Sequence, residues 1–221
     1  KTIFYFQSEN NIVKNLSFLL SNRATLNEYR AIYGNSEPSR IMSSLLQVSD
    51  ILHPQLERKM PGIIPIGIDQ DPHIRLTRDI AKRAKEFKFF LPSSIYNKFV
   101  PDLQGDLKMS KSKGNPLYLL DSDMEIKKKI SKALTGGQKT LKDQKKKGGN
   151  PDKDMLFELF KQHLIRDDKE LEKRIKDYRG GKILDSENKE YATKLLQDYM
   201  KDFRKRYEEA KKDISKFLIK S

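Results

Sequence analysis

Residues 63–72 read Ile-Ile-Pro-Ile-Gly-Ile-Asp-Gln-Asp-Pro, and this stretch decides the fold class. Its apolar part, residues 63–68, is typical of a parallel β-strand that is covered on both faces. Asp71 is well placed as the N-cap of a following helix, and Pro72 suits its first turn. A strand, a polar turn and a helix in direct succession form the repeating unit of an α/β fold. We therefore predict a parallel α/β sheet around this stretch.

Two polar residues, Asp69 and Gln70, follow the predicted strand directly. The expected helix then runs through residues 74–84, where apolar side chains recur at helical spacing. Ligands of open parallel sheets gather beyond the carboxyl ends of the strands. We therefore expect the side chains of Asp69 and Gln70 to border a binding site.

The segments before this stretch predict one further strand and several helices. Residues 2–6 are β-branched and aromatic, which predicts a short buried strand. Apolar spacing predicts helices near residues 12–20 and 39–52. Thr25 and Glu28 form the pattern of a capping box at the start of another helix. Because the chain opens almost directly on a strand, we expect a truncation, with part of the protein preceding it.

From residue 123 onward the sequence pattern is helical. Glycine-containing breaks interrupt it at residues 136–137, 148–150 and 180–181. We therefore predict two domains. The first, over residues 1–122, contains part of a parallel-sheet domain, and the second, over residues 123–221, is all-α.

The composition favours a polyanionic partner. The formal net charge is +14, and residues 127–149 contain nine lysines against one acid, Asp143. Such patches attract nucleic acid because each neutralised phosphate releases counterions. The alternative is a lysine-rich surface that is merely solvated.

The sequence also bounds the class of protein. Cysteine is absent, which excludes disulfides, thiolate metal sites and cysteine nucleophiles. No window approaches eighteen apolar residues and no secretory signal is visible, so we expect no membrane segment and a cytoplasmic setting.

Lys108-Met-Ser-Lys-Ser112 lies in a loop rich in glycine, serine and lysine. Two ammonium groups and two hydroxyls on one mobile segment suit a triphosphate, whose oxygens they can grip through charge-assisted hydrogen bonds. Taken alone, the pentapeptide is equally compatible with a solvated lysine-rich loop.

The combined motifs resemble the tryptophanyl-tRNA synthetases, in particular their archaeal and eukaryotic branch. The matching segments are Ile68-Asp-Gln-Asp-Pro72, Arg75-Leu-Thr-Arg-Asp79, Leu103-Gln-Gly105, Lys108-Met-Ser110, Ser131-Lys-Ala-Leu-Thr-Gly-Gly137, Gly148-Gly-Asn150 and Lys176-Asp-Tyr178. The resemblance implies a class I aminoacyl-tRNA synthetase with a Rossmann-like catalytic domain followed by a helical anticodon-binding domain.

What this resemblance implies is a tryptophan–tRNA ligase, which joins tryptophan to ATP and then transfers the aminoacyl group to tRNA-Trp. ATP would enter with Mg²⁺ as a substrate, with no protein-bound metal. The family also implies a homodimer without a membrane partner. Two alternatives remain open: a tyrosyl-tRNA synthetase and a non-enzymatic RNA-binding fragment.

The resemblance assigns roles to individual residues of the catalytic part. Lys108 and Lys111 would hold the pyrophosphate as charge develops and are the catalytic candidates. The candidate ATP-binding residues are Gly67, Asp69, Lys108, Met109, Ser110, Lys111 and Ser112. The candidate tryptophan-binding residues are Gln47, Asp50 and Gln70. Gln47 and Asp50 are equally compatible with an exposed helix face.

Candidate tRNA-binding residues come from charge and from resemblance. The basic residues are Lys145, Lys146, Lys147, Arg204 and Arg206, which we expect to contact the phosphate backbone. Asp167 and Asp168 resemble an acidic turn that contacts the anticodon in the family, although a helix N-cap would explain them equally well.

Two departures from the family pattern limit these assignments. The His-Ile-Gly-His signature is absent, and the only histidines are His53, His73 and His163. Because that signature contacts ATP phosphates in the family, we expect the 221-residue chain alone to be inactive in adenylate formation. Ser43 also stands where relatives often carry an aromatic-proline pair, which weakens the assignment of amino-acid specificity.

Overall fold

The computed structural model describes residues 4–34, 37–110 and 116–218. These residues form two compact units. The first contains the chain up to Lys98 together with the segment from Ile214, and the second runs from Phe99 to Asp213. The second unit thus begins ahead of the predicted domain boundary at residue 122 and includes the loop before the helices. The boundary itself stays a prediction.

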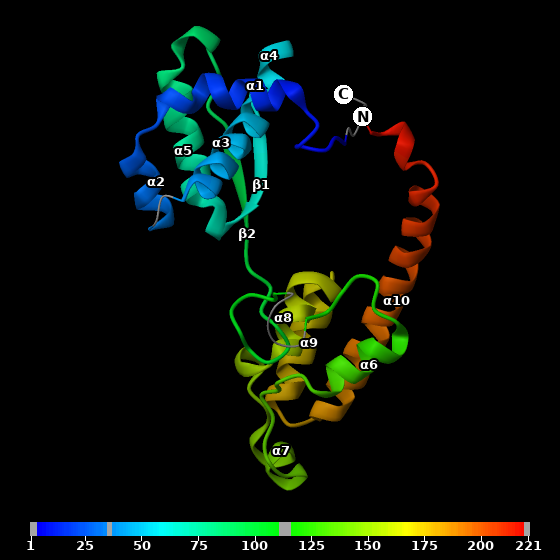
Figure 1. Ribbon diagram of the computed structural model, residues 1–221. Helices are drawn as coiled ribbons and strands as arrows, with labels where there is room; N and C mark the ends of the chain where they lie inside the picture. The colour runs from blue at the N-terminus through cyan, green and yellow to red at the C-terminus, as the bar shows by residue number, and fades with distance from the viewer. Residues whose placement is uncertain (1–3, 35–36, 111–115, 219–221) are drawn as a thin grey trace. The chain divides into compact units, whose positions relative to one another are not determined.

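The first unit combines a parallel pair of strands with helices (Figure 1). Its helices are α1 (Asn11–Leu20), α2 (Leu26–Tyr33), α3 (Pro38–Leu52), α4 (Pro54–Glu57) and α5 (Asp71–Arg83), and 3-10 turns lie at Ser21–Arg23, Ile68–Gln70, Lys85–Phe87 and Ile214–Lys216. Strands β1 (Ile63–Gly67) and β2 (Ser93–Asn97) pair in parallel, with Ile63 opposite Ser93. The α/β class predicted from residues 63–72 is confirmed.

Helix α1 packs on α3, and α3 packs on α5. Their shared core contains Leu16, Leu20, Tyr29, Leu45, Val48, Leu52, Leu76, Ile80, Ala81 and Ala84. The periodicity that predicted helices near residues 12–20 and 39–52 is therefore the apolar face of α1 and α3. Packing of α3 on α5 fixes the position of the turn that precedes α5, which is the turn that carries Asp69 and Gln70.

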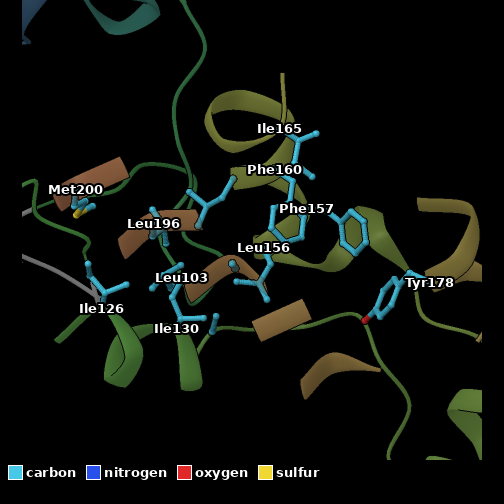
Figure 2. Close-up of a cluster of buried hydrophobic side chains, with 13 residues drawn as sticks. Leu103, Ile126, Ile130, Leu156, Phe157, Phe160, Ile165, Tyr178, Leu196 and Met200 are labelled. Atoms are coloured by element: carbon cyan, nitrogen blue, oxygen red, sulfur yellow. The ribbon is translucent and has the colours of Figure 1, made fainter. Parts of the chain in front are cut away.

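The second unit is helical over its described residues. Its helices are α6 (Asp123–Ser131), α7 (Leu141–Lys147), α8 (Met155–Leu159), α9 (Asp168–Arg179) and α10 (Asp185–Lys211), with a 3-10 turn at Pro151–Lys153 and a π-helical turn at Phe160–Leu164. Figure 2 shows its core, where Phe157 packs between Phe160 and Tyr178. The ring centroid of Phe157 lies 5.5 Å from that of Phe160 and 5.0 Å from that of Tyr178. No helix within the described ranges is long and apolar enough to cross a membrane.

Local sequence sets several helix starts. Thr25 and Glu28 form the predicted capping box of α2, and Ser122 and Glu125 form another at the start of α6. In both, the hydroxyl accepts a hydrogen bond from a backbone amide that the helix leaves unpaired, and the glutamate accepts one from the N-cap amide. Gly34 ends α2 at a φ of 69°, a conformation that glycine adopts without strain.

Strand β1 is less covered than its apolar sequence predicted. Ile63 is 64% exposed, and on β2 Ile95 is 57% exposed. Among the described residues, the two strands pair only with each other, and the side chains of Ile63 and Ile95 stay accessible. The prediction of a strand covered on both faces is therefore wrong for this structure, although the parallel pairing is right.

The buried strand predicted for residues 2–6 is also wrong over its described part. Phe4 makes one isolated bridge, to Leu218, and the amide of Phe4 donates to the carbonyl of Phe217 at 2.9 Å. Phe4 and Phe6 are both about half exposed. Residues 2 and 3 lie outside the described ranges.

Asp71 is the first residue of α5, and Gln70 occupies the N-cap position. The 3-10 turn Ile68–Gln70 already has helical geometry and runs directly into α5, so the helix begins one residue earlier than predicted. The carboxylate of Asp71 instead accepts a hydrogen bond from Tyr96 and forms an ion pair with Arg75 at 2.6 Å. Asp71 thereby ties the end of β2 to the first turn of α5.

Candidate functional site

The structure brings together two of the three predicted tryptophan-binding residues. Gln47 lies on α3, and Gln70 ends the turn that follows β1. The Nε2 atom of Gln47 donates a hydrogen bond to Oε1 of Gln70 at 3.2 Å. Both side chains are half-buried, because the packing of α3 on α5 encloses the start of α5. Paired amides supply donors and acceptors suited to a zwitterionic amino acid.

Asp50 lies one helical turn beyond Gln47 and is held by a residue outside the predicted site. The hydroxyl of Tyr5 donates a hydrogen bond to Oδ1 of Asp50. The ring of Tyr5 also contacts that of His53 edge-on, with centroids 5.4 Å apart. Burial raises the pKa of Tyr5, and the bond to the Asp50 carboxylate raises it further. Asp50 is therefore a half-buried member of a side-chain cluster and not part of an exposed helix face.

A cavity of about 600 Å³ lies beside this cluster within the first unit. Tyr5 and His53 form part of its wall. The other residues that line it are Phe6, Glu9, Asn10, Asn11, Ile12, Pro54, Glu57 and Arg58. The wall is mainly apolar, with two acidic residues, Glu9 and Glu57, and one basic residue, Arg58. Tyr5 was missed as a site residue because its place in an aromatic run suggested a buried strand.

The predicted nucleotide-side residues of the first unit lie at the carboxyl end of β1. Gly67 is the last residue of that strand, and Asp69 lies in the turn before α5. His73, two residues into α5, lies with Nδ1 2.9 Å from the hydroxyl of Tyr33. Burial lowers the pKa of His73, while the nearby carboxylate of Asp69 acts in the opposite direction. His73 is thus half-buried beside this turn.

Part of the Lys-Met-Ser-Lys-Ser segment is described, and it belongs to the second unit. The amide of Met109 donates to the carbonyl of Val100 at 2.7 Å, which closes a short loop. The ammonium group of Lys108 lies 5.1 Å above the ring of Phe99. Lys111 and Ser112, predicted to bind the phosphates, lie outside the described residues, whereas Ser110 is half-buried.

The loop before this segment is organised by an aspartate that the motifs did not reveal. Asp102 is 1% exposed, and its Oδ1 accepts hydrogen bonds from the amides of Gln104 at 2.8 Å and Asp106 at 2.9 Å. Leu103 is buried in the core of the second unit. Gly105 turns the chain at a φ of 98°. The turn that precedes Lys108 is therefore tightly structured.

Two further bonds connect this turn to the end of α6. The carbonyl of Leu103 accepts from the amide of Leu134 at 2.7 Å, and Nε2 of Gln104 donates to the carbonyl of Lys132 at 2.8 Å. Each residue of the Leu103-Gln-Gly105 motif thus has a structural role. Leu103 packs in the core, Gln104 bonds to the end of α6, and Gly105 adopts a positive φ.

The glycine motifs of the second unit lie where backbones meet side chains closely. A Cβ atom added at Gly137 would lie 2.2 Å from the carboxylate of Asp185, and one added at Gly149 would lie 2.3 Å from the ring of Tyr178. The Tyr178 hydroxyl donates to Oδ1 of Asp185 at 2.6 Å. These motifs therefore form one packed assembly around Tyr178.

Asp154 completes that assembly from the start of α8. It is fully buried, and its two oxygens accept from the amide of Leu156 at 2.8 Å and the amide of Gly136 at 3.2 Å. Burial raises the pKa of Asp154 even though both hydrogen bonds favour its ionised form. The pKa of Tyr178 is raised as well, by burial and by its bond to Asp185.

Several predicted tRNA-binding residues have a structural role within the second unit. Arg204 on α10 forms an ion pair with Asp123 at 2.7 Å and also donates to the carbonyl of Asp121, so it ties α10 to α6. Asp167 is the N-cap of α9, and its carboxylate accepts from the amide of Lys169 at 2.8 Å. Asp168 is the first residue of that helix.

The remaining predicted cations are exposed. Lys147 pairs with Asp143 at 3.2 Å and Arg206 with Asp202 at 2.8 Å, both one helical turn apart. Lys145 and Lys146 also lie on α7, in its last turn. Ion pairs as exposed as these contribute little to stability and leave the cations accessible to a polyanion. Within the described ranges, no group of three or more histidine, aspartate or glutamate side chains is arranged to hold a metal ion.

Comparison with known proteins identifies the family to which the chain belongs. Residues 1–201 match the family described as tRNA synthetases class I (W and Y). A tryptophan–tRNA ligase from Methanocaldococcus jannaschii is 44% identical over 223 residues, which cover 97% of this chain and 60% of that protein. One from Hyperthermus butylicus is 42% identical, with 90% of this chain and 55% of that protein covered.

Solved structures give the same result for the fold. The tryptophanyl-tRNA synthetase of Aeropyrum pernix superimposes with a TM-score of 0.91 at 37% identity, covering 98% of this chain and 60% of that one. The enzyme from Encephalitozoon cuniculi, solved with bound tryptophan, has a TM-score of 0.79 at 30% identity and covers 99% of this chain and 61% of that one. The chain thus spans about 60% of the length of these relatives.

Proposed function

Because this chain belongs to the class I tRNA synthetases that serve tryptophan and tyrosine, we propose that it carries the amino-acid-binding and Lys-Met-Ser-Lys-Ser parts of a tryptophan–tRNA ligase. The observation that carries the proposal is the bonded pair Gln47 and Gln70. These residues are distant in sequence, and the resemblance assigned both to the amino-acid site. Relatives at 44% and 42% identity are tryptophan–tRNA ligases, which favours tryptophan over tyrosine as the substrate.

The chemistry requires no nucleophile from the protein. The carboxylate oxygen of tryptophan attacks the α-phosphorus of ATP, a new carboxyl–phosphate bond forms, and the bond to pyrophosphate breaks. Negative charge then accumulates on the departing pyrophosphate. Cationic donors held near it lower the barrier through positioning and charge stabilisation. Lys108 and Lys111 are the residues we assign to this task.

The Gln47–Gln70 pair would hold the amino acid in place for this attack. An ammonium group needs hydrogen-bond acceptors, which the two amide oxygens provide, and the amide of Gln47 already fixes the orientation of Gln70. ATP enters with Mg²⁺ as part of the substrate, so the ion is carried by the phosphates. We assign Gly67 and Asp69 of the first unit, and Met109, Ser110 and Ser112 of the second, to binding of ATP.

We place tRNA-Trp on the second unit. The exposed cations of α7, Lys145–Lys147, and Arg206 on α10 suit its phosphates, and Asp167 and Asp168 stay candidates for the anticodon turn. Arg204 is a weaker candidate than its charge suggested, because Asp123 and the Asp121 carbonyl already occupy its guanidinium. The cytoplasmic setting stays a prediction.

The proposal also includes a second copy of the chain. Helix α1 leaves Phe18 71% exposed and Leu19 58% exposed, and Met42 on α3 is 44% exposed. Large apolar side chains that remain accessible on neighbouring helices suit an interface of two-fold symmetry. We expect a dimer by light scattering at micromolar concentration, and a monomer for the Phe18→Glu variant.

Amino-acid binding and pyrophosphate exchange test the activity. Calorimetry on the 221-residue chain should show binding of tryptophan in preference to tyrosine. Tryptophan-dependent ATP–pyrophosphate exchange should be slower than that of the Aeropyrum pernix relative by about 10²–10³-fold or more, because the sequence has no His-Ile-Gly-His signature and so has one phosphate clamp fewer. Preference for tyrosine would favour the sister family. Binding of tRNA without either amino acid would favour the RNA-binding alternative.

A further inference from the structure

Residues 116–121, which we call the return segment, lead from the Lys-Met-Ser-Lys-Ser region toward α6 and are held there by a buried ion pair. The ammonium group of Lys129 on α6 donates to both carboxylate oxygens of Asp121, at 2.8 Å and 2.6 Å. Only 17% of the Lys129 side chain and 5% of the Asp121 side chain are exposed. Removing either partner of such a pair would leave a buried charge without compensation. The pair therefore fixes the end of the return segment on α6.

Asp121 also organises the return segment itself. Its Oδ2 accepts a hydrogen bond from the amide of Tyr118 at 2.9 Å, and its own amide donates to the carbonyl of Tyr118 at 3.0 Å. The ammonium group of Lys129 lies 4.4 Å from the centroid of the Tyr118 ring, within the range of a cation–π contact. Arg204 on α10 donates to the carbonyl of Asp121. The return segment is thus bonded to two helices of the second unit.

One further contact joins the return segment to the residue beside Lys108. The amide of Leu117 donates to Sδ of Met109 at 3.3 Å, with the thioether as a weak acceptor. The amide of Met109 donates in turn to the carbonyl of Val100. Both Leu117 and Val100 pack against the core of the second unit. Met109 is therefore held between two core-bound segments, and the backbone at Lys108 is held with it.

This arrangement matters because Lys108 is an exposed cation on a flexible side chain. Ordering such a side chain around a ligand costs conformational entropy, and the cost is smaller when the backbone that carries it is already fixed. A cationic donor also stabilises developing charge only when it is held where that charge appears. The charge of Lys129, in contrast, is engaged by Asp121.

We propose that Lys129 is a positioning residue for binding of the ATP triphosphate. By holding Asp121 it fixes the return segment, which in turn fixes the backbone beside Lys108. The inference rests on the proposed tryptophan–tRNA ligase function, which assigns Lys108 to the phosphates, and adds to it a residue that acts without contacting the ligand. The alternative is that the ion pair only stabilises the fold of the second unit.

The test compares two double variants that make the same replacements and leave the net charge unchanged. Lys129→Met/Asp121→Asn removes both charges of the buried pair, so that no buried charge loses its partner, and the asparagine keeps an oxygen for the amide of Tyr118. The control, Lys182→Met/Asp177→Asn, removes a more exposed ion pair of the same unit, with side chains 76% and 22% exposed.

Binding of Mg·ATP and of inorganic pyrophosphate to the 221-residue chain is measured by isothermal titration calorimetry, below the melting temperature of every variant. We expect Lys129→Met/Asp121→Asn to weaken both ligands about tenfold or more, because small displacements of a positioned group are costly. The control should stay within about twofold of wild type, since exposed pairs contribute little. Tryptophan affinity, which we assign to Gln47 and Gln70 in the first unit, should be equal in all three proteins.

A second variant covers the case in which the first double variant does not fold. Tyr118→Leu leaves the ion pair in place and removes the ring beside the ammonium group of Lys129, at a side chain that is already 41% exposed. It should weaken Mg·ATP binding by about threefold, the size of a cation–π contact at a partly exposed site. Unchanged Mg·ATP affinity in this variant would overturn the inference.

The outcomes separate the inference from the proposed function. If the wild-type chain binds neither Mg·ATP nor pyrophosphate, the assignment of Lys108 to the phosphates fails, and the inference fails with it. If wild type and Lys129→Met/Asp121→Asn bind both ligands equally, the ion pair is structural only, while the proposed function stands. If Mg·ATP and tryptophan weaken by the same factor, the variant has lost folded protein, and the positioning role is overturned.

Discussion

In the first unit the motif residues contact one another through their side chains, whereas in the second unit the motif glycines are required because they have no side chain. Gln47 and Gln70 form a hydrogen-bonded pair of half-buried amides. Gly137 and Gly149 instead allow Asp185 and Tyr178 to approach the backbone within distances that a Cβ would block. Motif residues thus form a side-chain hydrogen bond in one unit and allow close backbone packing in the other, a difference that the sequence alone does not reveal.

The largest effect should come from the packing motifs. Gly148 has a φ of 70°, and an added Cβ would lie 1.8 Å from the carbonyl oxygen of Arg179. Gly148→Ala should therefore lower the free energy of unfolding by more than about 3 kcal/mol, beyond ordinary overpacking, because backbone and not a flexible side chain must move. Urea unfolding measures it. Gly62→Ala is the matched control, since its nearest neighbour would be an ordinary contact at 4.0 Å.

A ligand-side variant should lose more binding free energy than stability. Gln70→Ala should weaken tryptophan affinity by about 1.5–3 kcal/mol, roughly 10- to 150-fold, which is typical of a hydrogen bond to a charged group. Isothermal titration calorimetry gives the affinity and urea unfolding checks the stability. Gln162→Ala, which removes a bond to Glu158 in the second unit, serves as control. Equal affinity in wild type and Gln70→Ala would show that Gln70 packs in the fold and binds nothing.

Asp154 allows the packing of the second unit to be tested through the pH dependence of its stability. Its folded-state pKa is raised by burial, so the protonated form is the one that folding favours. That contribution is fully present below the pKa of an unfolded aspartate, about 4, and is lost as pH rises through the raised folded value. Wild type should therefore lose stability relative to Asp154→Asn over this interval, by about 1.4 kcal/mol per unit of raised pKa. Parallel stability curves between pH 4 and 8 would contradict the prediction.

The smallest effect is expected at the cluster of Tyr5, Asp50 and His53. Tyr5→Phe removes the donor to the Asp50 carboxylate and keeps the ring contact with His53. We expect a loss of about 1 kcal/mol in unfolding free energy, the usual net value of one hydrogen bond. Chemical denaturation followed by circular dichroism measures it. A tryptophan affinity that falls more than the stability would make Tyr5 a residue that positions Asp50 for the ligand.

Local rules explain which parts of the fold were predictable. The capping box of Thr25 and Glu28 needs only four residues of sequence, and it is present as predicted. The start of α5 was misplaced by one residue because the choice between Gln70 and Asp71 depends on the 3-10 turn before them. The exposure of Ile63 could not be predicted either, since an apolar run does not say whether a second layer covers it.

The candidate site shows the same limit. Spacing and resemblance selected Gln47 and Gln70, but their hydrogen bond depends on how α3 packs on α5, which no local pattern encodes. Arg204 has the charge expected of an RNA-binding residue, yet it lies beside Asp123 and forms an ion pair that connects α10 to α6.

The anchored turn before Lys108 has a mechanical consequence. Leu103 and Gln104 connect this turn to the segment that follows α6, and the Asp102 carboxylate holds the turn itself together. The chain between that segment and Lys108 is therefore short and bonded at several points. A displacement of the end of α6 should therefore also move Lys108, because these hydrogen bonds and the short backbone segment between them connect the two.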